Sequence, residues 1–433
     1  MAKRILVVSQ HYWPETFRST DVCEGLAALG YEVDVLCGLP NYPKGELLPG
    51  YGFFKKRRQR QNGVEIFRAW EVPRRGNTNL RIFLNYISFP FFAVFDLLRL
   101  AGRRYDAVFC YETSPVLMAF PALVYGKLHR VPTSIYVLDL WPENLYSILD
   151  IQKPLLRRIA AGVSLWHYKT ADRLIAMSPA LGQRLRERTG KGEDAVAVIP
   201  QYCEELYLQD VEDEALRCRF AGKFNVVFAG NFSPAQALDN LVDVALQLKA
   251  AGEEGIRFVL VGDGMSREAL LARIEREGVG DYFSWEGPHP MQDIPRYHTM
   301  ADALVACLAK SEDIGLTIPA KITSYCAAGR PVLASMDGEG ARVIEEAGCG
   351  FASPAGDIDA LTKNLLSLAH MSDAERNEMG LRGRAYNNAN FNRGQLLRQL
   401  AGFLLGQDDK PLYRQPVCGH PLLFNKNGGA IRP

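Results

Sequence analysis

The chain has 433 residues, which exceeds the size at which one hydrophobic core usually stops growing, so two domains are expected. Its formal net charge of +1 excludes a general attraction to nucleic acid, and any anion must be recognised locally. The nine cysteines include no C-x-x-C pair, and no secretion signal precedes the first apolar run at 5–8. These features predict a cytoplasmic protein with reduced thiols.

Apolar runs alternate with amphipathic helices along both halves of the chain. Apolar runs between helices indicate parallel strands covered on both faces, so the pattern predicts two doubly wound α/β domains. A helix is expected over 19–29. The expected strands are 5–8, 32–36, 107–110, 134–138, 174–176 and 195–199 in the first half, and 225–229, 258–261, 283–286, 303–306 and 332–334 in the second.

The periodicity breaks at 200–202, and an acidic run follows, so we place a hinge there. The predicted division is an N-terminal domain at 1–199, a C-terminal domain at 200–390 and a final segment at 391–433. Ser372 and Glu375 form a capping box that predicts a helix reaching about Asn388. The polar tail from 407 is expected to be peripheral or poorly ordered.

The most apolar stretch of the chain is 80–100, but charged residues and Pro90 interrupt it below the roughly 20 clean residues that a membrane span needs. Upstream, 53–60 interleaves aromatic residues with five cations. Two interpretations remain open. The first is a buried helix beside a solvated basic loop, and the second is a peripheral contact with an anionic membrane.

A helix start in the second half carries the strongest functional signal. Pro319 has no N–H to lose in a first helical turn, free N–H groups there favour an anion, and Lys321 adds a full positive charge. Gly329 suits the left-handed end of this helix, and Pro331 prevents its continuation. The segment predicts a phosphate site, although an ordinary helix-to-strand junction with an exposed lysine explains it equally well.

Three turns that follow strands are predicted to surround the same ligand. An apolar strand runs into Gly230, which lets the backbone approach a diphosphate, before a helix expected near Pro234. Neither a Walker pattern nor G-x-G-x-x-G is present there, which argues against an ATPase and a dinucleotide enzyme. Plain turns are the alternative for each segment. The donor-binding candidates in these turns are Gly230, Asn231, Ser233, Gln236, Gly262, Gly264 and Pro288.

In the first half, polar side chains follow two strand ends and are predicted to face a second substrate, the acceptor. Asp139 is predicted to activate or orient it, and Glu143 to bind it, unless one of them caps a helix. His11, Glu15 and Arg18 follow the first strand and are predicted to contact the acceptor as well. No metal is predicted, because a helix dipole and cations can offset the charge of a departing diphosphate.

Four segments follow the order seen in retaining bacterial glycosyltransferases of family 4: 40–43, 139–143, 199–201 and the signature at 317–332. The chain resembles that family from about residue 3 to 391, and within it the branch of N-acetyl-L-fucosaminyltransferases of O-antigen assembly. The resemblance implies a GT-B fold whose last helix, at 393–405, crosses back onto the first domain. It also implies a UDP-sugar donor, a polyprenyl-diphosphate-linked saccharide acceptor, no cofactor and work at the inner face of the bacterial cell membrane.

By the same resemblance, Glu312 joins Asp139 and Lys321 in the catalytic set. Three positions depart from the family pattern: Gln236 replaces a usual basic residue, Leu138 a usual histidine, and Ser324 a glutamate that often binds ribose. Ser324 can still hydrogen-bond a hydroxyl. A UDP-sugar 2-epimerase and an inert glycosyltransferase-like scaffold remain the alternatives.

Overall fold

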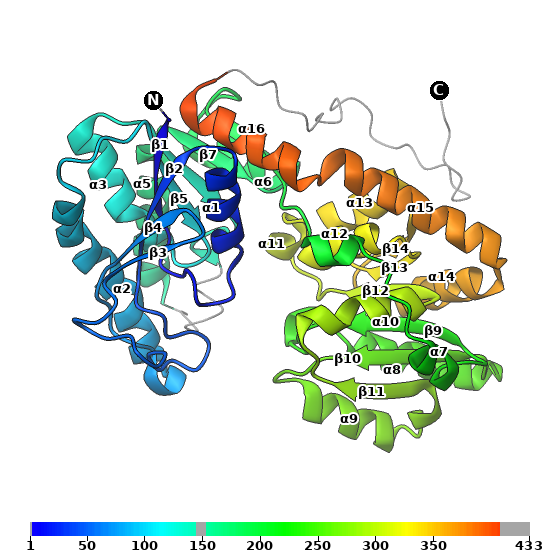
Figure 1. Cartoon of the computed structure of the whole chain (residues 1–433). Helices are drawn as coiled ribbons and strands as arrows, with labels where there is room; N and C mark the ends of the chain where they lie inside the picture. The colour runs from blue at the N-terminus through cyan, green and yellow to red at the C-terminus, as the bar shows by residue number, and fades with distance from the viewer. Residues whose placement is uncertain (1, 144–152, 408–433) are drawn as a thin grey trace.

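The computed structural model describes residues 2–143 and 153–407, which fold into two α/β domains (Figure 1). The N-terminal sheet has the strand order β3-β4-β2-β1-β5-β6-β7-β8, and β3 alone is antiparallel to its neighbour. Its strands are β1 (Arg4–Val8), β2 (Glu32–Cys37), β3 (Arg58–Gln61), β4 (Val64–Arg68), β5 (Ala107–Glu112), β6 (Thr133–Val137), β7 (Arg173–Ala176) and β8 (Val196–Val198). Its helices include α1 (Arg18–Ala28), α2 (Asn79–Asp96), α3 (Phe120–His129), α5 (Pro154–Thr170) and α6 (Pro179–Thr189).

The C-terminal sheet is parallel and has the strand order β11-β10-β9-β12-β13-β14. Its strands are β9 (Phe224–Ala229), β10 (Ile256–Val261), β11 (Phe283–Gly287), β12 (Ala303–Cys307), β13 (Val332–Ser335) and β14 (Gly350–Ser353). Its helices include α7 (Glu214–Arg219), α8 (Asp239–Ala251), α9 (Arg267–Arg276), α10 (Ile294–Met300), α11 (Glu312–Gly315), α12 (Ala320–Ala328), α13 (Glu339–Ala347) and α14 (Ile358–His370).

Each strand expected from the sequence is present, with ends shifted by no more than two residues. Three strands were missed: β3, β4 and β14. The basic segment at 53–60, which was predicted to be a loop, runs into β3. The backbone of Arg60 in β3 lies opposite that of Glu65 in β4 across the hairpin. Because β3 is an exposed edge strand, polar residues occupy both of its faces, and no apolar alternation signals it.

Two long helices, α15 (Asp373–Asn390) and α16 (Arg393–Leu405), lie end to end and bridge the domains (Figure 1). Helix α15 starts at the predicted capping box, and α16 has the predicted bounds. Leucines of α16 pack into the core of the N-terminal domain, and Arg393 pairs with Asp21 of α1 at 2.9 Å. The crossing-back helix of the GT-B fold is thereby confirmed.

Helix α2 continues into a short 3-10 turn, so Asn79–Leu100 forms 22 helical residues despite Pro90. By length and composition this helix is apolar enough to cross a membrane, contrary to the expectation from the sequence. A third of its apolar window is buried inside the fold. Phe89 and Ala93 are wholly buried, so one face of α2 belongs to the core of the N-terminal domain.

Candidate functional site

A cavity of about 520 Å³ lies between the domains, at the carboxyl ends of the C-terminal strands. Open parallel sheets bind ligands at this edge, because the loops that leave the strands meet helix starts there. Arg18 and Glu204 border the cavity opposite the C-terminal sheet. Of the predicted donor residues, Gly230, Asn231, Gly262, Pro288, Lys321 and Ser324 line it.

Closely packed glycines shape the floor of this cavity. Gly230 has a φ of 146°, which side-chain-bearing residues rarely adopt, and its N–H donates to the Val261 carbonyl at 2.9 Å. A Cβ on Gly262 would lie 2.0 Å from the Gly230 carbonyl oxygen, and one on Gly264 would lie 2.3 Å from that of Phe232. Only residues without side chains allow these two turns to pack, and two of the glycines, Gly230 and Gly262, line the cavity.

The segment after Gly230 differs from the prediction. Pro234–Gln236 forms a single 3-10 turn, Ala237 takes a left-handed conformation with a φ of 41°, and α8 begins only at Asp239. The Phe232 N–H donates to the Asp263 carbonyl and is therefore not available to a ligand. The helix start predicted near Pro234 is wrong. Among the described residues, the N-terminal residues of α12 line the cavity instead.

Lys321 lies in the first turn of α12, with its side chain packed against the Gly230 turn. Its ammonium donates to the side-chain carbonyl of Gln236 and lies 3.6 Å from the centroid of the Phe228 ring. The structure thus brings together two donor candidates that are 85 residues apart. Burial lowers the pKa of Lys321 to about 7, so the ammonium is only partly charged at neutral pH in this state.

Pro319 was predicted in the first helical turn, but it is the N-cap of α12, one position before the first helical residue, and no side chain caps the helix. Uncapped N–H groups in a first helical turn favour an anion. The Ser324 hydroxyl donates to the Ala320 carbonyl at 3.0 Å, so toward a ligand it can act only as an acceptor. Gly329 ends the helix in the predicted left-handed conformation, with a φ of 68°.

Glu312 opens α11, a short helix capped by Ser311. Its side chain lies outside the described part of the structure, so its predicted catalytic role stays a prediction. The same loop crosses the domain boundary, because Leu316 packs against the core of the N-terminal domain and its carbonyl accepts a hydrogen bond from Ser178. The backbone that carries Glu312 is therefore held by both domains.

On the far side of the cavity, Pro288 and His289 lie where the nucleoside is predicted. His289 is hydrogen-bonded to the Tyr297 hydroxyl at 2.9 Å. His298, which the sequence analysis missed, is buried in the cavity wall with its ring centroid 5.4 Å from that of Tyr207 and 5.3 Å from that of Tyr325. Burial lowers the pKa of His298 to about 3, so its ring is neutral at physiological pH.

Asp139 follows β6 in the N-terminal domain. Buried Glu112, at the end of the adjacent strand β5, was also missed by the sequence analysis. Burial raises the pKa of Glu112 well above its usual range, and the charge of Asp139 adds to that rise. Glu143 is paired with Arg188 of α6 at 3.1 Å, so any acceptor contact through Glu143 competes with this ion pair.

The remaining acceptor candidates occupy different places. His11 and Glu15 are buried and contact each other at 3.1 Å, and Glu15 also accepts the backbone N–H of Asn41 at 2.7 Å. Both lie below the surface and hold neighbouring loops. Arg18 lines the donor cavity rather than a separate acceptor site, and its guanidinium is bound to the Tyr202 carbonyl and to Glu204 at the hinge.

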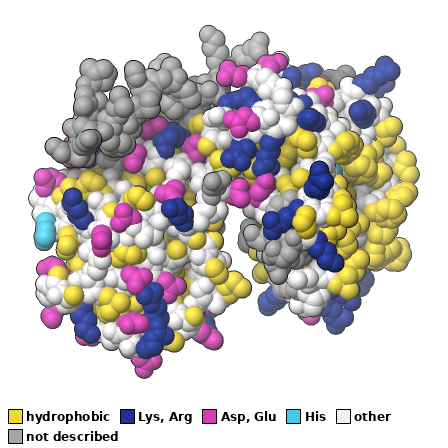
Figure 2. Space-filling view, turned by 180° about the vertical axis from the view of Figure 1, so that it is seen from behind, with side chains coloured by type: hydrophobic (Ala, Val, Ile, Leu, Met, Phe, Trp, Pro, Cys, Tyr) yellow, Lys and Arg dark blue, Asp and Glu magenta, His cyan; other side chains and the backbone are white. Residues whose placement is uncertain are grey.

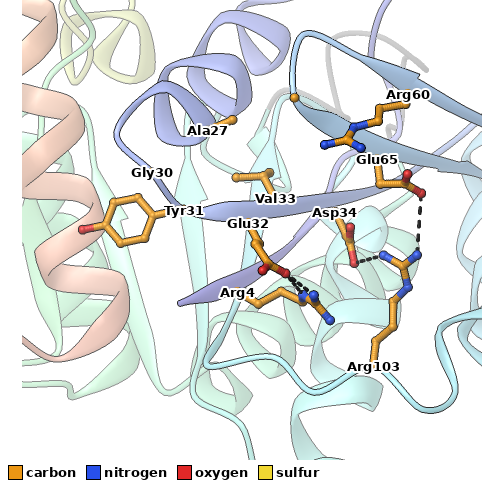
Figure 3. A pocket seen from close by; sticks show the side chains of 11 residues that line it. Arg4, Ala27, Gly30, Tyr31, Glu32, Val33, Asp34, Arg60, Glu65 and Arg103 are labelled. Carbon is orange, nitrogen blue, oxygen red and sulfur yellow. Dashed lines mark hydrogen bonds and ion pairs between the residues drawn. The ribbon is translucent and has the colours of Figure 1, made fainter. Parts of the chain in front are cut away.

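A second cavity, of about 620 Å³, lies at the opposite, amino edge of the N-terminal sheet (Figure 3). Arg4 there is paired with Glu32, and Arg103 lies 2.6 Å from Asp34 and 3.6 Å from Glu65. These ion pairs weaken any field that would attract a diphosphate. Within 2–143 and 153–407, no group of three or more His, Cys, Asp or Glu side chains is placed to hold a metal ion.

Two family models match the chain, one for each domain. The Glycosyl transferase 4-like domain matches residues 17–201, and Glycosyl transferases group 1 matches residues 223–371. Each half of the chain is thus similar to a glycosyltransferase family, and the chain is a glycosyltransferase with the GT-B fold.

Known relatives agree with this assignment. WcaI of Escherichia coli K12, named as a colanic acid biosynthesis glycosyl transferase, is 23% identical over 344 residues, which cover 75% of this chain and 81% of WcaI. Alr3699/HepE of Anabaena, solved in complex with UDP, has a TM-score of 0.68 at 17% identity, covering 93% of this chain and all of that one. WaaG, a glycosyltransferase involved in lipopolysaccharide biosynthesis, has a TM-score of 0.63 at 15% identity, covering 93% and 99%.

Proposed function

We propose that this chain is a retaining glycosyltransferase that moves a sugar from a UDP-sugar to a lipid-linked saccharide during the assembly of a surface polysaccharide. The observation that carries the proposal is the Lys321 ammonium at the start of α12, beside a bare glycine floor in the cavity between the domains. The UDP bound to HepE and the roles in the names of WcaI and WaaG support it.

The charge balance of the reaction explains the proposed roles. A departing nucleoside diphosphate gains negative charge, which the Lys321 ammonium and the N-terminal end of α12 would offset. Asp139 would orient the acceptor hydroxyl, Glu312 would face the donor sugar, and Ser324 would accept a hydrogen bond from a ribose hydroxyl. The proposal includes no metal or cofactor. Its donor sugar is an N-acetylated 6-deoxyamino sugar, and its acceptor carries a polyprenyl diphosphate.

The two alternatives have less support. Both family models are those of glycosyltransferases, so a UDP-sugar 2-epimerase is not favoured. The interpretation as an inert scaffold rests on three residues that depart from the family pattern: Leu138, Gln236 and Ser324. Gln236 accepts a hydrogen bond from Lys321, so the residue that replaces the usual cation still has a role beside the proposed phosphate site.

Titration calorimetry with UDP tests the proposed donor site. We expect one molecule of UDP per chain, and mass spectrometry with a panel of UDP-sugars and a polyprenyl-diphosphate saccharide should show the acceptor gaining one sugar. An inert scaffold would bind no UDP. An epimerase would convert the free UDP-sugar without acceptor.

We also propose that one flank of the N-terminal domain contacts the cytoplasmic face of the bacterial cell membrane. Hydrophobic side chains cover this flank in Figure 2, and apolar patches of such extent are rare on soluble monomers. Helix α3 lies between α2 and α5 and joins them. The ring centroids of Phe120 on α3 and Trp166 on α5 are 6.0 Å apart. The exposed residues are Leu80, Phe83, Leu84, Ile87, Phe91, Phe95 and Leu98 on the first helix and Leu155, Leu156, Ile159, Val163 and Trp166 on the second.

Flotation with phosphatidylglycerol vesicles tests the membrane contact. Arg57 forms an ion pair with Asp96 at 2.7 Å, so reversing the charge of Arg57 would damage the fold. Replacement of the exposed apolar residues therefore tests the membrane contact more directly. Joint replacement of Phe83, Phe91 and Phe95 by serine should abolish flotation, because burying each ring in lipid contributes roughly 2 kcal/mol. The matched control is Leu381→Ser, an exposed apolar residue of α15. Equal flotation of the triple variant and the control would contradict the proposal.

A further inference from the structure

The loops that follow β1, β2 and β4 meet at the carboxyl edge of the N-terminal sheet, where buried polar side chains join them. Glu71 accepts hydrogen bonds from Gln10 at 2.8 Å and from Asn41 at 2.5 Å. Asn85 accepts from Gln10 and from Arg74, each at 2.9 Å. Burial raises the pKa of Glu71 well above its usual range, and the nearby charge of Arg74 partly offsets that rise. This network fixes Arg74 without a direct ion pair among the described residues.

The guanidinium of Arg74 is held by neutral acceptors. One of its N–H groups donates to His11 Nε2 at 3.0 Å, and the opposite ring nitrogen of His11 donates to Glu15. Burial lowers the pKa of His11, which keeps Nε2 free to accept. The guanidinium also lies 5.1 Å from the Tyr86 ring and 5.8 Å from the Tyr42 ring. In the described chain no carboxylate contacts Arg74, and its Nη1 has no acceptor.

Two more cations, Lys44 and Arg75, are carried by the backbone that adjoins Arg74. A Cβ on Gly45 would lie 2.8 Å from the Arg74 carbonyl oxygen and 3.1 Å from the Arg75 nitrogen, so the loop after β2 packs directly on the loop after β4. Lys44 and Arg75 are exposed, and over the described ranges neither they nor the neighbouring Glu46 forms an ion pair. We call Lys44, Arg74 and Arg75 the Arg74 cluster. A partly buried cation without a counter-ion is costly unless an anion compensates it.

We propose that the Arg74 cluster is a binding subsite for the phosphate groups of the acceptor. A guanidinium fixed on one side presents its remaining N–H groups as a fork that matches phosphate oxygens. The subsite adjoins the donor cavity, because the His11 ring stacks on Phe17 at 4.7 Å and Arg18, the next residue, lines that cavity.

The position also suits a lipid-linked molecule. Helix α2 begins at Asn79, a few residues after Arg75, and its exposed apolar face continues from there. A phosphate at the cluster would leave the lipid chain beside that face and the saccharide beside the cavity. The inference rests on the proposed function only in its choice of an acceptor phosphate as the anion.

Calorimetry on the full chain with excess UDP tests the subsite, with farnesyl diphosphate as the probe and farnesol as the probe without phosphate. We expect farnesyl diphosphate to bind, and Arg74→Ala to weaken it at least about tenfold, which is typical for the loss of a charge-assisted contact. Lys44→Ala and Arg75→Ala, which replace exposed side chains, should each weaken it less. Arg104→Ala is the matched control, because Arg104 is an exposed arginine just before β5, at the opposite edge of the sheet.

Each outcome is decisive. Equal affinity of Arg74→Ala and wild type for farnesyl diphosphate, or equal binding of farnesol and farnesyl diphosphate, would overturn the subsite. If Arg74→Ala unfolds, unchanged binding in both Lys44→Ala and Arg75→Ala overturns it. A purely structural role of Arg74 would lower UDP affinity and probe affinity together, whereas the subsite predicts that UDP affinity is unchanged. Failure of the wild type to bind UDP would refute the proposed function and not the subsite.

Discussion

Replacement of Lys321 by methionine is expected to abolish most turnover and to weaken UDP binding by about 2–5 kcal/mol, the usual cost of removing one partner of a buried charged pair. Methionine is one atom shorter than lysine but is also unbranched, so it keeps most of the packing on Phe228 and Gly230 and supplies no charge to the diphosphate. Calorimetry and a transfer assay measure the two effects. Lys310→Met, which replaces an exposed lysine of the same domain, should change neither.

The same substitution should stabilise the empty protein, because it removes a buried cation that has no carboxylate partner in the described structure. The pKa of Lys321 is about 7 in the fold and about 10.4 in an unfolded chain. Between these values the unfolded chain binds more protons, so the lysine destabilises most below pH 7 and its penalty disappears as the pH rises toward 10.4. Denaturant unfolding at pH 6 and pH 9 should therefore show a larger advantage for Lys321→Met at pH 6.

Binding of the diphosphate should also raise the protonated fraction of Lys321. At pH 7 about half of the empty sites carry a neutral lysine, so UDP binding to the wild type should take up about half a proton more than binding to Lys321→Met. Calorimetry in two buffers of different ionisation enthalpy measures that difference. Wild-type turnover in Lys321→Met, or equal proton uptake in both proteins, would contradict the phosphate role.

The second large effect is expected for Gly230→Ala. An alanine Cβ there would lie 2.7 Å from Lys321 Cε and 2.9 Å from Nζ, so the ammonium must move away from the floor of the cavity. The backbone φ of 146° adds strain. We expect UDP binding to fall nearly as far as in Lys321→Met, with a loss of stability of roughly 1–2 kcal/mol from the strained backbone. Calorimetry and thermal unfolding measure the two quantities.

Gly222→Ala separates strain from contact. Gly222 also has a positive φ, of 87°, but a Cβ there would meet nothing within 4 Å. This control should lose similar stability and keep full UDP affinity. If Gly230→Ala binds UDP as tightly as Gly222→Ala, the close approach of Lys321 to the glycine turn has no part in donor binding.

Local pattern was enough to predict most elements. Apolar strand runs and the capping box at Ser372 are signals that a short window contains in full, whereas the helix Arg393–Leu405 was expected from the family resemblance. The hairpin of β3 and β4 was not predicted, because its edge strand β3 has no buried face. The helix expected near Pro234 failed because the left-handed Ala237 separates that turn from α8, and alanine carries no sequence signal for this conformation.

The sequence by itself determined two largely parallel sheets and supplied the glycines and the lysine of the proposed phosphate site, because these depend on residue types at short spacing. Tertiary structure alone decided that Gln236 meets Lys321 across 85 residues and that Arg74 meets His11 across 63. Such contacts arise where loops from neighbouring parallel strands converge at one edge of a sheet. The strand order determines which loops converge, and no short window of sequence encodes the strand order. For that reason the acceptor side, built almost wholly from such loops, was the part least accessible to sequence reasoning.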